Sequence, residues 1–318
     1  MQDNFGRQIN YLRLSVTDLC NLRCKYCMPD GVACKLNHED ILRLEEIEKI
    51  ADIFISLGIT KIRITGGEPL LRKNIMSLIN NLGRREGLKE LALTTNGILL
   101  KDFAKDLKQA GVNSINISLD TLNKQKFYDL TGKDDLHKVL EGLEETKKIG
   151  FKSIKLNVVL IKNFNDDEIE DFIDLTMHEN IDVRFIELMP VGSCASWALG
   201  KYILNNIVLE KMPELKKEYH QELSSPALYY KLPQAKGRVG LINSVTGKFC
   251  AWCNRIRLSA DGHLKLCLHK NNEIDLKKYI REKKDIDKIV REFVLEKPES
   301  HKLENGVYSD KDMFRIGG

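Results

Sequence analysis

Three cysteines near the start of the chain have types and spacing that could perform chemistry. Cys20, Cys24 and Cys27 follow a C-x₃-C-x₂-C pattern directly after the alternating run Tyr11–Val16. Structural zinc sites and cysteine-held iron–sulfur cubanes usually take four protein ligands. Three local thiolates therefore suggest a cluster with one iron left open for a substrate or cofactor. A zinc knuckle with a distant fourth ligand and a disulfide-forming set are the alternatives.

A second cysteine set lies in the last third of the chain. Cys250, Cys253 and Cys267 follow a C-x₂-C-x₁₃-C pattern. An Asp-Gly dipeptide between Arg255–Leu258 and Leu264–Leu268 predicts a hairpin, which brings Cys267 beside the C-x-x-C pair. The sequence thus predicts a second three-thiolate site.

The metal at this second site is not decided by spacing alone. A zinc site completed by His263 or His269 is one possibility. Two three-cysteine sites in one chain favour two open clusters, the second facing the substrate. Cys34 and Cys194 are left over and are interpreted as structural or incidental.

Several basic residues are candidates for one shared binding site. They lie on predicted strands and on the hairpin beside the second cysteine set: Arg13, Arg63, Lys155, Arg184, Arg255 and Arg257. Buried guanidinium groups need anionic partners, and their planar fork matches phosphate oxygens. A triphosphate would satisfy such a set, whereas a neutral peptide would not.

A strand-then-helix rhythm must position these residues. Apolar-rich segments predict strands at Tyr11–Val16, Lys61–Thr65, Leu91–Thr94, Ser114–Leu119, Ser153–Leu160 and Asp182–Leu188. Helical periodicity covers Leu44–Leu57, Lys101–Ala110 and Leu136–Ile149, each followed by a glycine that ends it. Alternating strands and helices predict an α/β fold with a parallel sheet, and six units predict an incomplete TIM-type barrel.

The predicted strands alternate in polarity, which is unusual for a filled barrel. In Tyr11–Thr17, Leu12 and Leu14 oppose Arg13 and Ser15. Closed barrels fill their interior with branched apolar side chains. Since helices should cover the apolar face, the polar face should line an open lumen that holds a large polar ligand. An antiparallel sheet with one solvated face is the alternative.

Composition places the chain in a broad class. Its 318 residues suffice for a large and a smaller domain, and 42% hydrophobic with 30% charged residues is ordinary for a globular protein. We expect no membrane-spanning segment. A net charge of +4 does not indicate a nucleic-acid-binding surface. Eight cysteines without a secretory signal indicate reduced thiols in the cytoplasm.

A Gly-Gly-Glu-Pro turn follows the predicted strand Lys61–Thr65. Gly66 and Gly67 could adopt positive φ and approach a ligand closely, because they lack a Cβ. At the carboxyl end of a parallel strand, this turn lies where barrel sites form. An ordinary turn is the alternative.

The segment Thr17–Pro29, with Thr-Asp-x-Cys-Asn-x-x-Cys-x-Tyr-Cys, resembles the cluster loop of radical S-adenosylmethionine (SAM) enzymes. In that family three cysteines hold a 4Fe–4S cluster whose open iron chelates SAM, and reduction of SAM yields a 5′-deoxyadenosyl radical. The resemblance implies SAM contacts at Tyr26, Gly67, Ser118 and Met189.

Within this family the chain resembles the enzymes that catalyse the first step of molybdenum cofactor biosynthesis. The matching segments are spread along the chain: Arg13–Asp18, Lys61–Pro69, Thr94–Gly97, Asn116–Asp120, Arg184–Met189, the second cysteine set with Asn254-Arg-x-Arg, and the terminal Gly317-Gly318. The resemblance implies two 4Fe–4S clusters, and conversion of GTP to (8S)-3′,8-cyclo-7,8-dihydroguanosine 5′-triphosphate by hydrogen abstraction at ribose C3′ and attack on C8.

The resemblance also assigns roles to individual residues. Those implied to hold GTP are Arg13, Arg63, Thr94, Lys155, Arg184, Arg255, Ile256 and Arg257. Gly317 and Gly318 are implied to enter the barrel and act, with Arg257, in catalysis. The implied partners are a reductant protein and a downstream cyclic pyranopterin monophosphate synthase that takes the product, and the resemblance allows a homodimer.

We expect a barrel domain over residues 1–225 and a smaller domain over residues 226–318 that carries the second cluster and closes the open side.

Two other functions are alternatives to the one that the resemblance implies. A radical SAM peptide-modifying enzyme would keep the first motif but should lack the arginine set. A zinc-binding RNA-interaction protein would use Arg255–Arg257 on the hairpin and would be no enzyme.

Overall fold

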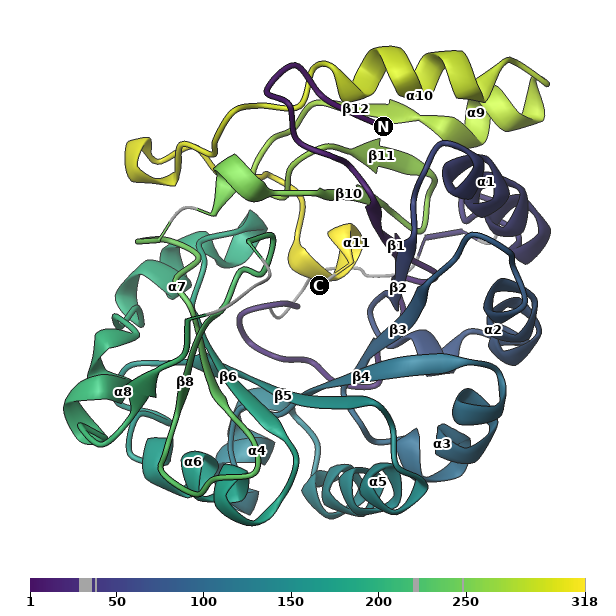
Figure 1. The fold of residues 1–318 in the computed structure, drawn as a ribbon. Coiled ribbons are helices and arrows are strands. Elements are labelled where there is room, and N and C mark those ends of the chain that lie inside the picture. Colours follow the sequence, from purple (N-terminus) through teal and green to yellow (C-terminus); the bar gives the residue numbers. More distant parts are fainter. Residues whose placement is uncertain (29–35, 38, 220–222, 248, 318) are drawn as a thin grey trace.

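A curved sheet with helices on its outer side forms the body of the molecule (Figure 1). The computed structural model describes residues 1–28, 36–37, 39–219, 223–247 and 249–317. Within these residues twelve strands form one sheet in the order β12-β11-β10-β1-β2-β3-β4-β5-β6-β9-β8-β7. The two flanks of this order come from the C-terminal third of the chain.

The strands fall into a central parallel set and two shorter flanking sets. Their bounds are β1 Tyr11–Ser15, β2 Lys61–Thr65, β3 Glu90–Thr95, β4 Val112–Ser118, β5 Ser153–Leu160, β6 Asp182–Glu187, β7 Lys216–Lys217, β8 Leu228–Lys231, β9 Val239–Ile242, β10 Arg255–Leu258, β11 His263–Lys265 and β12 Glu273–Asp275.

Most helices connect successive strands. Their bounds are α1 Leu44–Ser56, α2 Ile75–Gly83, α3 Leu100–Gln109, α4 Lys124–Thr131, α5 Leu136–Ile149, α6 Ile169–His178, α7 Ala195–Gly200, α8 Asn206–Lys211, α9 Leu276–Arg281, α10 Ile286–Val294 and α11 Met313–Ile316, with short 3₁₀ turns at Pro69–Leu71, Gly192–Cys194, Cys250–Trp252 and Leu303–Asn305.

Strands β1 to β6 pair consecutively and in parallel, which confirms the incomplete barrel. The alternative of an antiparallel sheet is therefore wrong for this part. The C-terminal third lengthens both ends of the barrel, because β10 pairs in parallel with β1 and β9 pairs in parallel with β6. Among the described strands, β12 and β7 are the two edges, so the barrel stays open.

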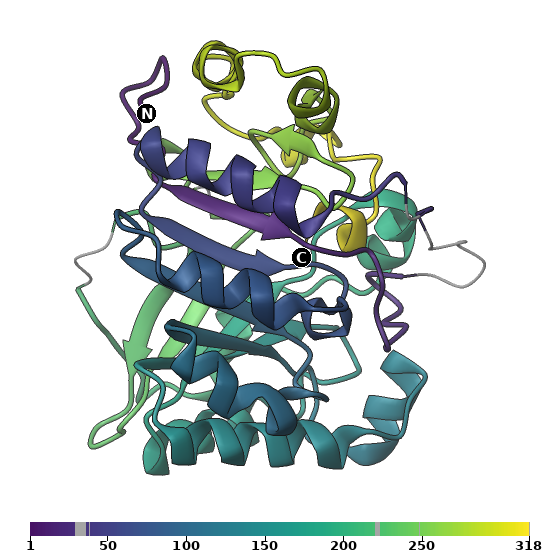
Figure 2. The same cartoon turned by 90° about the vertical axis from the view of Figure 1, so that its right-hand side faces the viewer.

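The apolar face of the strands packs against the helices, as the alternation predicts. Leu12, Ile64, Ile117 and Leu156 are each 0% exposed within one hydrophobic core. Figure 2 shows helices stacked along this outer side, while Figure 1 shows the short helix α11 (Met313–Ile316) on the inner side of the ring. The inner face is consequently available to the polar side chains.

Helix ends follow the expected glycine signals. Gly58, Gly111 and Gly150 follow α1, α3 and α5 with φ of +97°, +88° and +73°, a left-handed conformation that glycine adopts without steric cost. The prediction for Leu136–Ile149 matches α5 at both ends. The predicted hairpin is confirmed by antiparallel pairing of β10 with β11, although β11 ends at Lys265 and leaves Cys267 in the following loop.

None of the helices in the described ranges has the length and apolar character that crossing a bilayer requires.

Candidate functional site

The first cysteine set lies on the loop that follows β1. Backbone amides of Cys27 and Met28 both donate to the carbonyl oxygen of Cys24, at 2.9 and 2.8 Å, which folds the loop into a tight turn. The turn is fixed to the end of α4, because the amide of Arg23 donates to Thr131 at 2.8 Å. The three cysteines, all half-buried, are thus held on one short turn.

The thiols of this loop affect one another. Burial raises the pKa of the Cys24 thiol well above its usual value, and the neighbouring Cys27 raises it further. Burial and then Cys20 likewise raise the pKa of Cys27. Such thiols become thiolates when a cationic centre compensates their charge. The donor set therefore fits an iron–sulfur cluster.

A single bound metal ion is the alternative to a cluster at each cysteine set. Among the residues that the structure describes, no three or more His, Cys, Asp and Glu side chains are arranged to hold a single metal ion. Thiolates on one zinc ion lie roughly 3.8 Å apart, since each Zn–S bond is about 2.3 Å. In a cubane each cysteine binds a different iron, so a wider spacing is expected.

The two glycines after β2 support the cluster loop. The amide of Gly67 donates to Thr17 at 2.8 Å, and a Cβ at Gly67 would lie 2.4 Å from the carbonyl oxygen of Leu19. Neither glycine has a positive φ, so that part of the interpretation is wrong. Glycine is needed here because the backbone of the cluster loop passes directly over it. Contact between Gly67 and SAM remains a prediction.

A buried carboxylate, Glu68, joins the ends of β2 and β3 next to this loop. It accepts hydrogen bonds from the hydroxyl of Thr95 at 2.9 Å and from the amide of Asn96 at 2.7 Å. The side chain of Asn96 in turn donates to Asn21 at 2.7 Å and lies 3.8 Å from the Cys20 sulfur. Burial raises the pKa of Glu68 to about 7. This network orients the first cysteine.

Of the side chains expected to contact SAM, Tyr26 has a defined partner. Its phenol donates to Asp120 at 2.7 Å, and the other carboxylate oxygen accepts from the amide of Val159 at 2.8 Å. This bond fixes the ring of Tyr26 beside the end of β4, where Ser118 also lies. Met189 lines the central cavity. No contact of these residues with SAM is tested, so their role stays a prediction.

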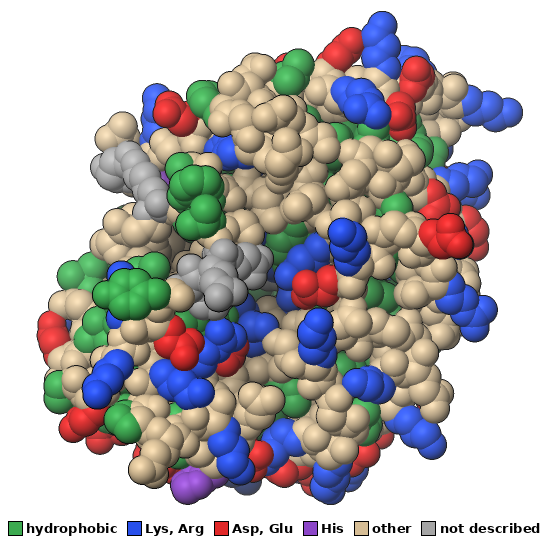
Figure 3. Space-filling model, viewed as in Figure 1, with side chains coloured by type: hydrophobic (Ala, Val, Ile, Leu, Met, Phe, Trp, Pro, Cys, Tyr) green, Lys and Arg blue, Asp and Glu red, His purple; other side chains and the backbone are tan. Residues whose placement is uncertain are grey.

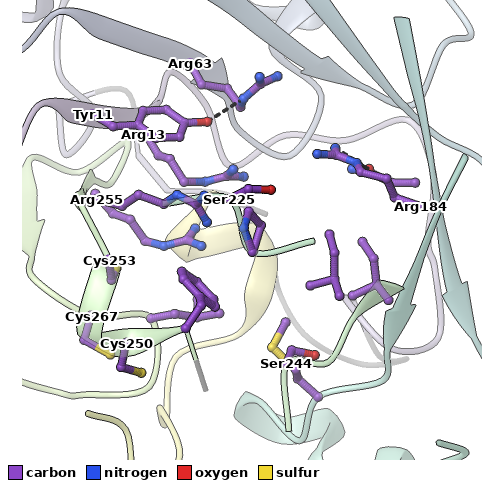
Figure 4. Close-up of a pocket in the computed structure, with 18 of the residues that line it drawn as sticks. Tyr11, Arg13, Arg63, Arg184, Ser225, Ser244, Cys250, Cys253, Arg255 and Cys267 are labelled. Carbon is purple, nitrogen blue, oxygen red and sulfur yellow. Dashed lines mark hydrogen bonds between the residues drawn. The ribbon is translucent and has the colours of Figure 1, made fainter. Parts of the chain in front are cut away.

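The second cysteine set lines the same cavity. Cys250 begins a 3₁₀ turn that ends before Cys253, and Cys267 follows β11, so that all three lie together at one side of the cavity (Figure 4). His263, one alternative zinc ligand, does not line the cavity and instead pairs with Asp261 at 3.1 Å. His269 does line it.

The cavity is about 310 Å³ and its wall is strongly basic. Seven cationic side chains line it: Arg13, Lys61, Arg63, Lys155, Arg184, Arg255 and Arg257. Among the described residues of the lining, none is Asp or Glu. Figure 3 shows Lys and Arg side chains gathered near the centre of the corresponding face. The predicted convergence of the basic residues is confirmed.

Parallel pairing explains why these cations converge. Arg13 of β1 lies in register with Arg63 of β2 on one side and Arg257 of β10 on the other. Figure 4 shows Arg13, Arg63 and Arg255 entering the cavity from one wall and Arg184 from the opposite wall. Burial and the charge of Arg255 lower the pKa of Arg257 to about 10, and burial followed by Arg184 lowers that of Lys155 to about 8. An anion in the cavity would relieve both effects.

Ile256 and Thr94, which were also predicted to hold GTP, lie in different surroundings from the cationic side chains. The side chain of Ile256 is 0% exposed in the core, so only its backbone could contact a ligand. The hydroxyl of Thr94 is buried without a hydrogen-bond partner among the described residues, as is the amide oxygen of its neighbour Asn116. Since buried polar atoms are normally paired, these two indicate a polar ligand at the β3–β4 edge of the lumen.

The chain end returns to this site. Helix α11 lies inside the ring in Figure 1, and the following Gly317 accepts a hydrogen bond from Arg257 at 2.7 Å. Its Cα faces the end of β2, since a Cβ there would lie 2.6 Å from the hydroxyl of Thr65. The expected entry of the tail into the barrel is thus seen for Gly317. Gly318 and Cys34 lie outside the described residues.

Comparisons with known proteins cover nearly the whole chain. Residues 14–176 match the radical SAM superfamily, and residues 181–303 match the family described as Molybdenum Cofactor Synthesis C. A protein of Peptoclostridium acidaminophilum named GTP 3′,8-cyclase is 55% identical over 317 residues, 99% of this chain and 98% of that protein. One of Alkaliphilus oremlandii with the same name is 49% identical over 100% of both chains.

The chain belongs to the GTP 3′,8-cyclase family within the radical SAM superfamily. Members of that superfamily hold a 4Fe–4S cluster that binds SAM. The convergent thiols of Cys20, Cys24 and Cys27 fit such a cluster.

Solved structures support the fold alone. Streptococcus suis SuiB bound to its precursor peptide SuiA superimposes with a TM-score of 0.61 at 15% identity, covering 87% of this chain. SuiB bound to S-adenosylmethionine gives a TM-score of 0.56 at 14% identity, covering 85% of this chain. This chain spans 65% and 64% of the length of those two structures.

Sequence reasoning missed three residues of this GTP 3′,8-cyclase family site. Tyr11 accepts a hydrogen bond from Arg63 inside the cavity, yet an aromatic residue opening a strand is usually interpreted as core. Glu68 was part of a recognised turn but had no assigned role. Phe249 stacks beneath Arg255, 5.0 Å from guanidinium to ring centre, and nothing in the local sequence indicates that contact.

Proposed function

We propose that this chain is an enzyme that converts GTP to (8S)-3′,8-cyclo-7,8-dihydroguanosine 5′-triphosphate in the first step of molybdenum cofactor biosynthesis. One observation carries the proposal: seven cations and the three thiols of the second cysteine set line one cavity whose described lining contains no carboxylate. The relatives that match this chain over their full length bear the name of this activity.

The charge of the cavity selects the substrate class. A nucleoside triphosphate carries roughly four negative charges at neutral pH, about two of them on the terminal phosphate. The guanidinium forks of Arg13, Arg63 and Arg257 lie in one row across three strands and can bind such a chain of phosphates. A neutral ligand would not neutralise the positive charge of these buried side chains.

We assign the second cysteine set to a second 4Fe–4S cluster. Cys250, Cys253 and Cys267 would hold such a cluster with one iron free of protein ligands, and all three side chains line the cavity. A single GTP molecule can therefore contact the cations through its phosphates and the cysteine side of the cavity through its base. Ile256, whose side chain is buried, would contribute only its backbone.

SAM and the first cluster belong at the loop of Cys20, Cys24 and Cys27. When bound, they supply the 5′-deoxyadenosyl radical that takes hydrogen from ribose C3′, after which C3′ bonds to C8 of guanine. The chain itself positions the reactants: Tyr26 and Ser118 lie at the end of β4, Gly67 lies under the cluster loop, and Met189 lies in the cavity wall. Holding C3′ close to the radical source and excluding water and protein hydrogen donors are the main contributions of such a scaffold.

Arg257 and Gly317 form the catalytic contact that we propose for the tail. The carbonyl of Gly317 accepts from Arg257 within the cavity wall. Arg257 is thereby oriented toward the phosphates while the tail covers the lumen. Gly318 would extend this contact.

The proposed function requires partners beyond the chain. Cleavage of SAM consumes one electron, and a second electron and one proton must be added after C3′ bonds to C8, so a reductant protein has to serve the clusters. The product still contains its triphosphate, and a cyclic pyranopterin monophosphate synthase would take it up. We further propose that the protein forms a homodimer and acts in the cytoplasm. The division of the chain into a barrel domain over residues 1–225 and a smaller domain over residues 226–318 is also part of the proposal.

A peptide-modifying enzyme is the second candidate function. One of the fold neighbours, SuiB, is described with a bound precursor peptide, but at 15% identity it supports the fold alone. A peptide would have to neutralise seven cations. The charge of the cavity therefore disfavours this candidate.

The test is anaerobic turnover of the protein carrying both clusters with SAM, dithionite and GTP, followed by chromatography and mass spectrometry of the nucleotide. We expect an isomer of GTP with unchanged mass and altered retention, formed together with 5′-deoxyadenosine and methionine. ATP serves as the control nucleotide and should remain unchanged. SAM cleavage with all GTP recovered intact would overturn the proposal.

A further inference from the structure

The inner face of β10, β1 and β2 forms an ordered grid of side chains. Pairing places Tyr11 between Arg255 and Lys61, and places Arg13 between Arg257 and Arg63 in the next row. Five of these six side chains are cationic. Tyr11 is thus the one group in the grid that can accept a hydrogen bond or carry negative charge.

Tyr11 contacts all three neighbouring cations. Its oxygen accepts a hydrogen bond from Nε of Arg63 at 2.6 Å, drawn as the dashed line in Figure 4. The amine of Lys61 lies 4.9 Å from the ring centre, and the guanidinium of Arg255 lies 5.4 Å from it. The side chain is only 6% exposed, so these contacts occur away from bulk water.

The phenol also determines how Arg63 is presented. Arg63 uses Nε for Tyr11 and one terminal nitrogen for the carbonyl oxygen of Leu93 at 3.0 Å. Two anchors at opposite sides fix the guanidinium plane. The remaining terminal nitrogen can then donate to a ligand in the cavity.

We propose that Tyr11 is a positioning residue of the phosphate site: its oxygen orients Arg63, and its ring separates Lys61 from Arg255 before a triphosphate binds. This inference rests on the proposed function, because it names the group that prepares the site for GTP. It assigns a role to a residue that acts on the substrate through neighbouring side chains and does not contact it directly.

The charges around Tyr11 give the proposal a measurable consequence. Burial alone would raise the pKa of the phenol, but Arg63, Arg13, Arg255 and Lys61 outweigh it and lower the pKa to about 7. Other charged groups also lie near Tyr11. Arg257 lies in the next row of the grid, and Lys155 of β5 and Arg184 of β6 line the same cavity as Tyr11. Glu90 of β3 pairs with Lys61 at 2.9 Å.

The sign of the effect follows from linkage. A bound triphosphate disfavours a neighbouring phenolate, so the pKa of Tyr11 must rise when GTP binds. The protein therefore takes up a proton on binding GTP above about pH 7, and GTP affinity falls as pH rises through that range. A phenylalanine at this position cannot contribute to this proton uptake.

The test compares wild type, Tyr11→Phe and Tyr128→Phe by calorimetry, using anaerobic protein with both clusters. Tyr128 is 52% exposed on α4 and serves as the matched control. Near pH 6.5, Tyr11→Phe should bind GTP roughly threefold to tenfold more weakly than wild type, because Arg63 loses one anchor. Between about pH 6.5 and pH 8.5 wild type should lose roughly tenfold more affinity than Tyr11→Phe.

Titrations near pH 8 in two buffers of different ionisation enthalpy add a direct count of protons taken up. Lys155 and the phosphates of GTP contribute equally to both proteins, so the difference isolates Tyr11. Equal proton uptake and parallel affinity profiles would overturn the inference, even if iron content and SAM cleavage are normal. If wild type binds no GTP at all, the proposed function fails instead.

Discussion

Arg257 in β10 donates a hydrogen bond of 2.7 Å to the carbonyl oxygen of Gly317, a residue sixty positions further along the chain. The same arginine lines the cavity and lies in register with Arg13. One guanidinium group thus joins the phosphate site to the end of the chain. Nucleotide binding and tail position should therefore depend on each other.

Replacing Arg257 with alanine should weaken GTP binding at least tenfold. The change removes a charge-assisted hydrogen bond, for which a loss of about 1.5–3 kcal/mol is typical. Calorimetry with GTP under anaerobic conditions measures the effect, and iron and sulfide analysis should show both clusters retained. Arg291→Ala on α10, an arginine with a 59% exposed side chain, is the control and should bind GTP normally. An unchanged affinity in Arg257→Ala would contradict a role in the phosphate site.

Substitution of Gly317 by alanine should uncouple SAM cleavage from cyclisation. Gly317 has φ of +81°, and the added Cβ would lie 2.6 Å from the Thr65 hydroxyl, so the tail must move. We expect cyclised nucleotide to fall at least tenfold while 5′-deoxyadenosine continues to form, because ribose is no longer held in its reactive geometry.

Gly306 provides the matched control for this substitution. It has φ of +70° but nothing within 4 Å of an added Cβ, so Gly306→Ala introduces the backbone strain without the collision. Its ratio of cyclised nucleotide to 5′-deoxyadenosine should equal that of wild type. An equal loss of cyclisation in both variants would mean that backbone strain, and not the position of the tail, causes the effect.

Cys24→Ala should remove one cluster and abolish SAM cleavage. Burial and then Cys27 raise the pKa of the Cys24 thiol, burial and then Cys20 raise that of Cys27, and loss of one ligand leaves two for the cluster. Iron and sulfide content should fall by about half, since the set around Cys253 is untouched. Ser56→Ala, at an exposed position on α1, should keep the iron content of wild type. Retained SAM cleavage in Cys24→Ala would rule out this loop as the SAM cluster site.

The charge of Lys155 should make GTP binding dependent on pH above neutrality. Burial, followed by the charge of Arg184, lowers the pKa of this lysine to about 8. The ammonium form predominates below that value and is favoured by bound phosphate, so affinity should fall as pH rises from about 8 to about 9.5. Phosphate groups, with a second pKa of about 6, keep their charge over this range.

Lys155→Arg should flatten this part of the profile, because arginine stays protonated. Lys124→Arg, at a position whose side chain is 75% exposed, should leave the profile unchanged. Calorimetric titrations at several pH values measure both. A wild-type and a Lys155→Arg profile that coincide would exclude Lys155 from the binding site.

Much of the barrel could be predicted because local patterns encode it. The strand Ser153–Leu160 and the helix Leu136–Ile149 match β5 and α5, since alternation, helical periodicity and the glycine after the helix all agree. The pairing of β10 with β1 was not predicted. It joins segments more than two hundred positions apart, and no local pattern encodes such a partner.

The site shows the same division between local and distant information. Residue type and alternation placed Arg13, Arg63 and Lys155 on one face, and the cavity confirms this. Tyr11 was missed because its role depends on its neighbours in β2 and β10. Gly67 was recognised, but its expected positive φ was wrong, and the atom nearest to an added Cβ belongs to Leu19 on another loop.

The proposed function requires that the radical generated from SAM takes the hydrogen from C3′ of GTP within this cavity. The most direct test is anaerobic turnover with GTP carrying deuterium at C3′, with mass spectrometry of the 5′-deoxyadenosine formed. We predict that the 5′-deoxyadenosine gains one deuterium and that the cyclised nucleotide has lost it. Unlabelled 5′-deoxyadenosine, formed while the deuterium stays on the nucleotide, would contradict the claim.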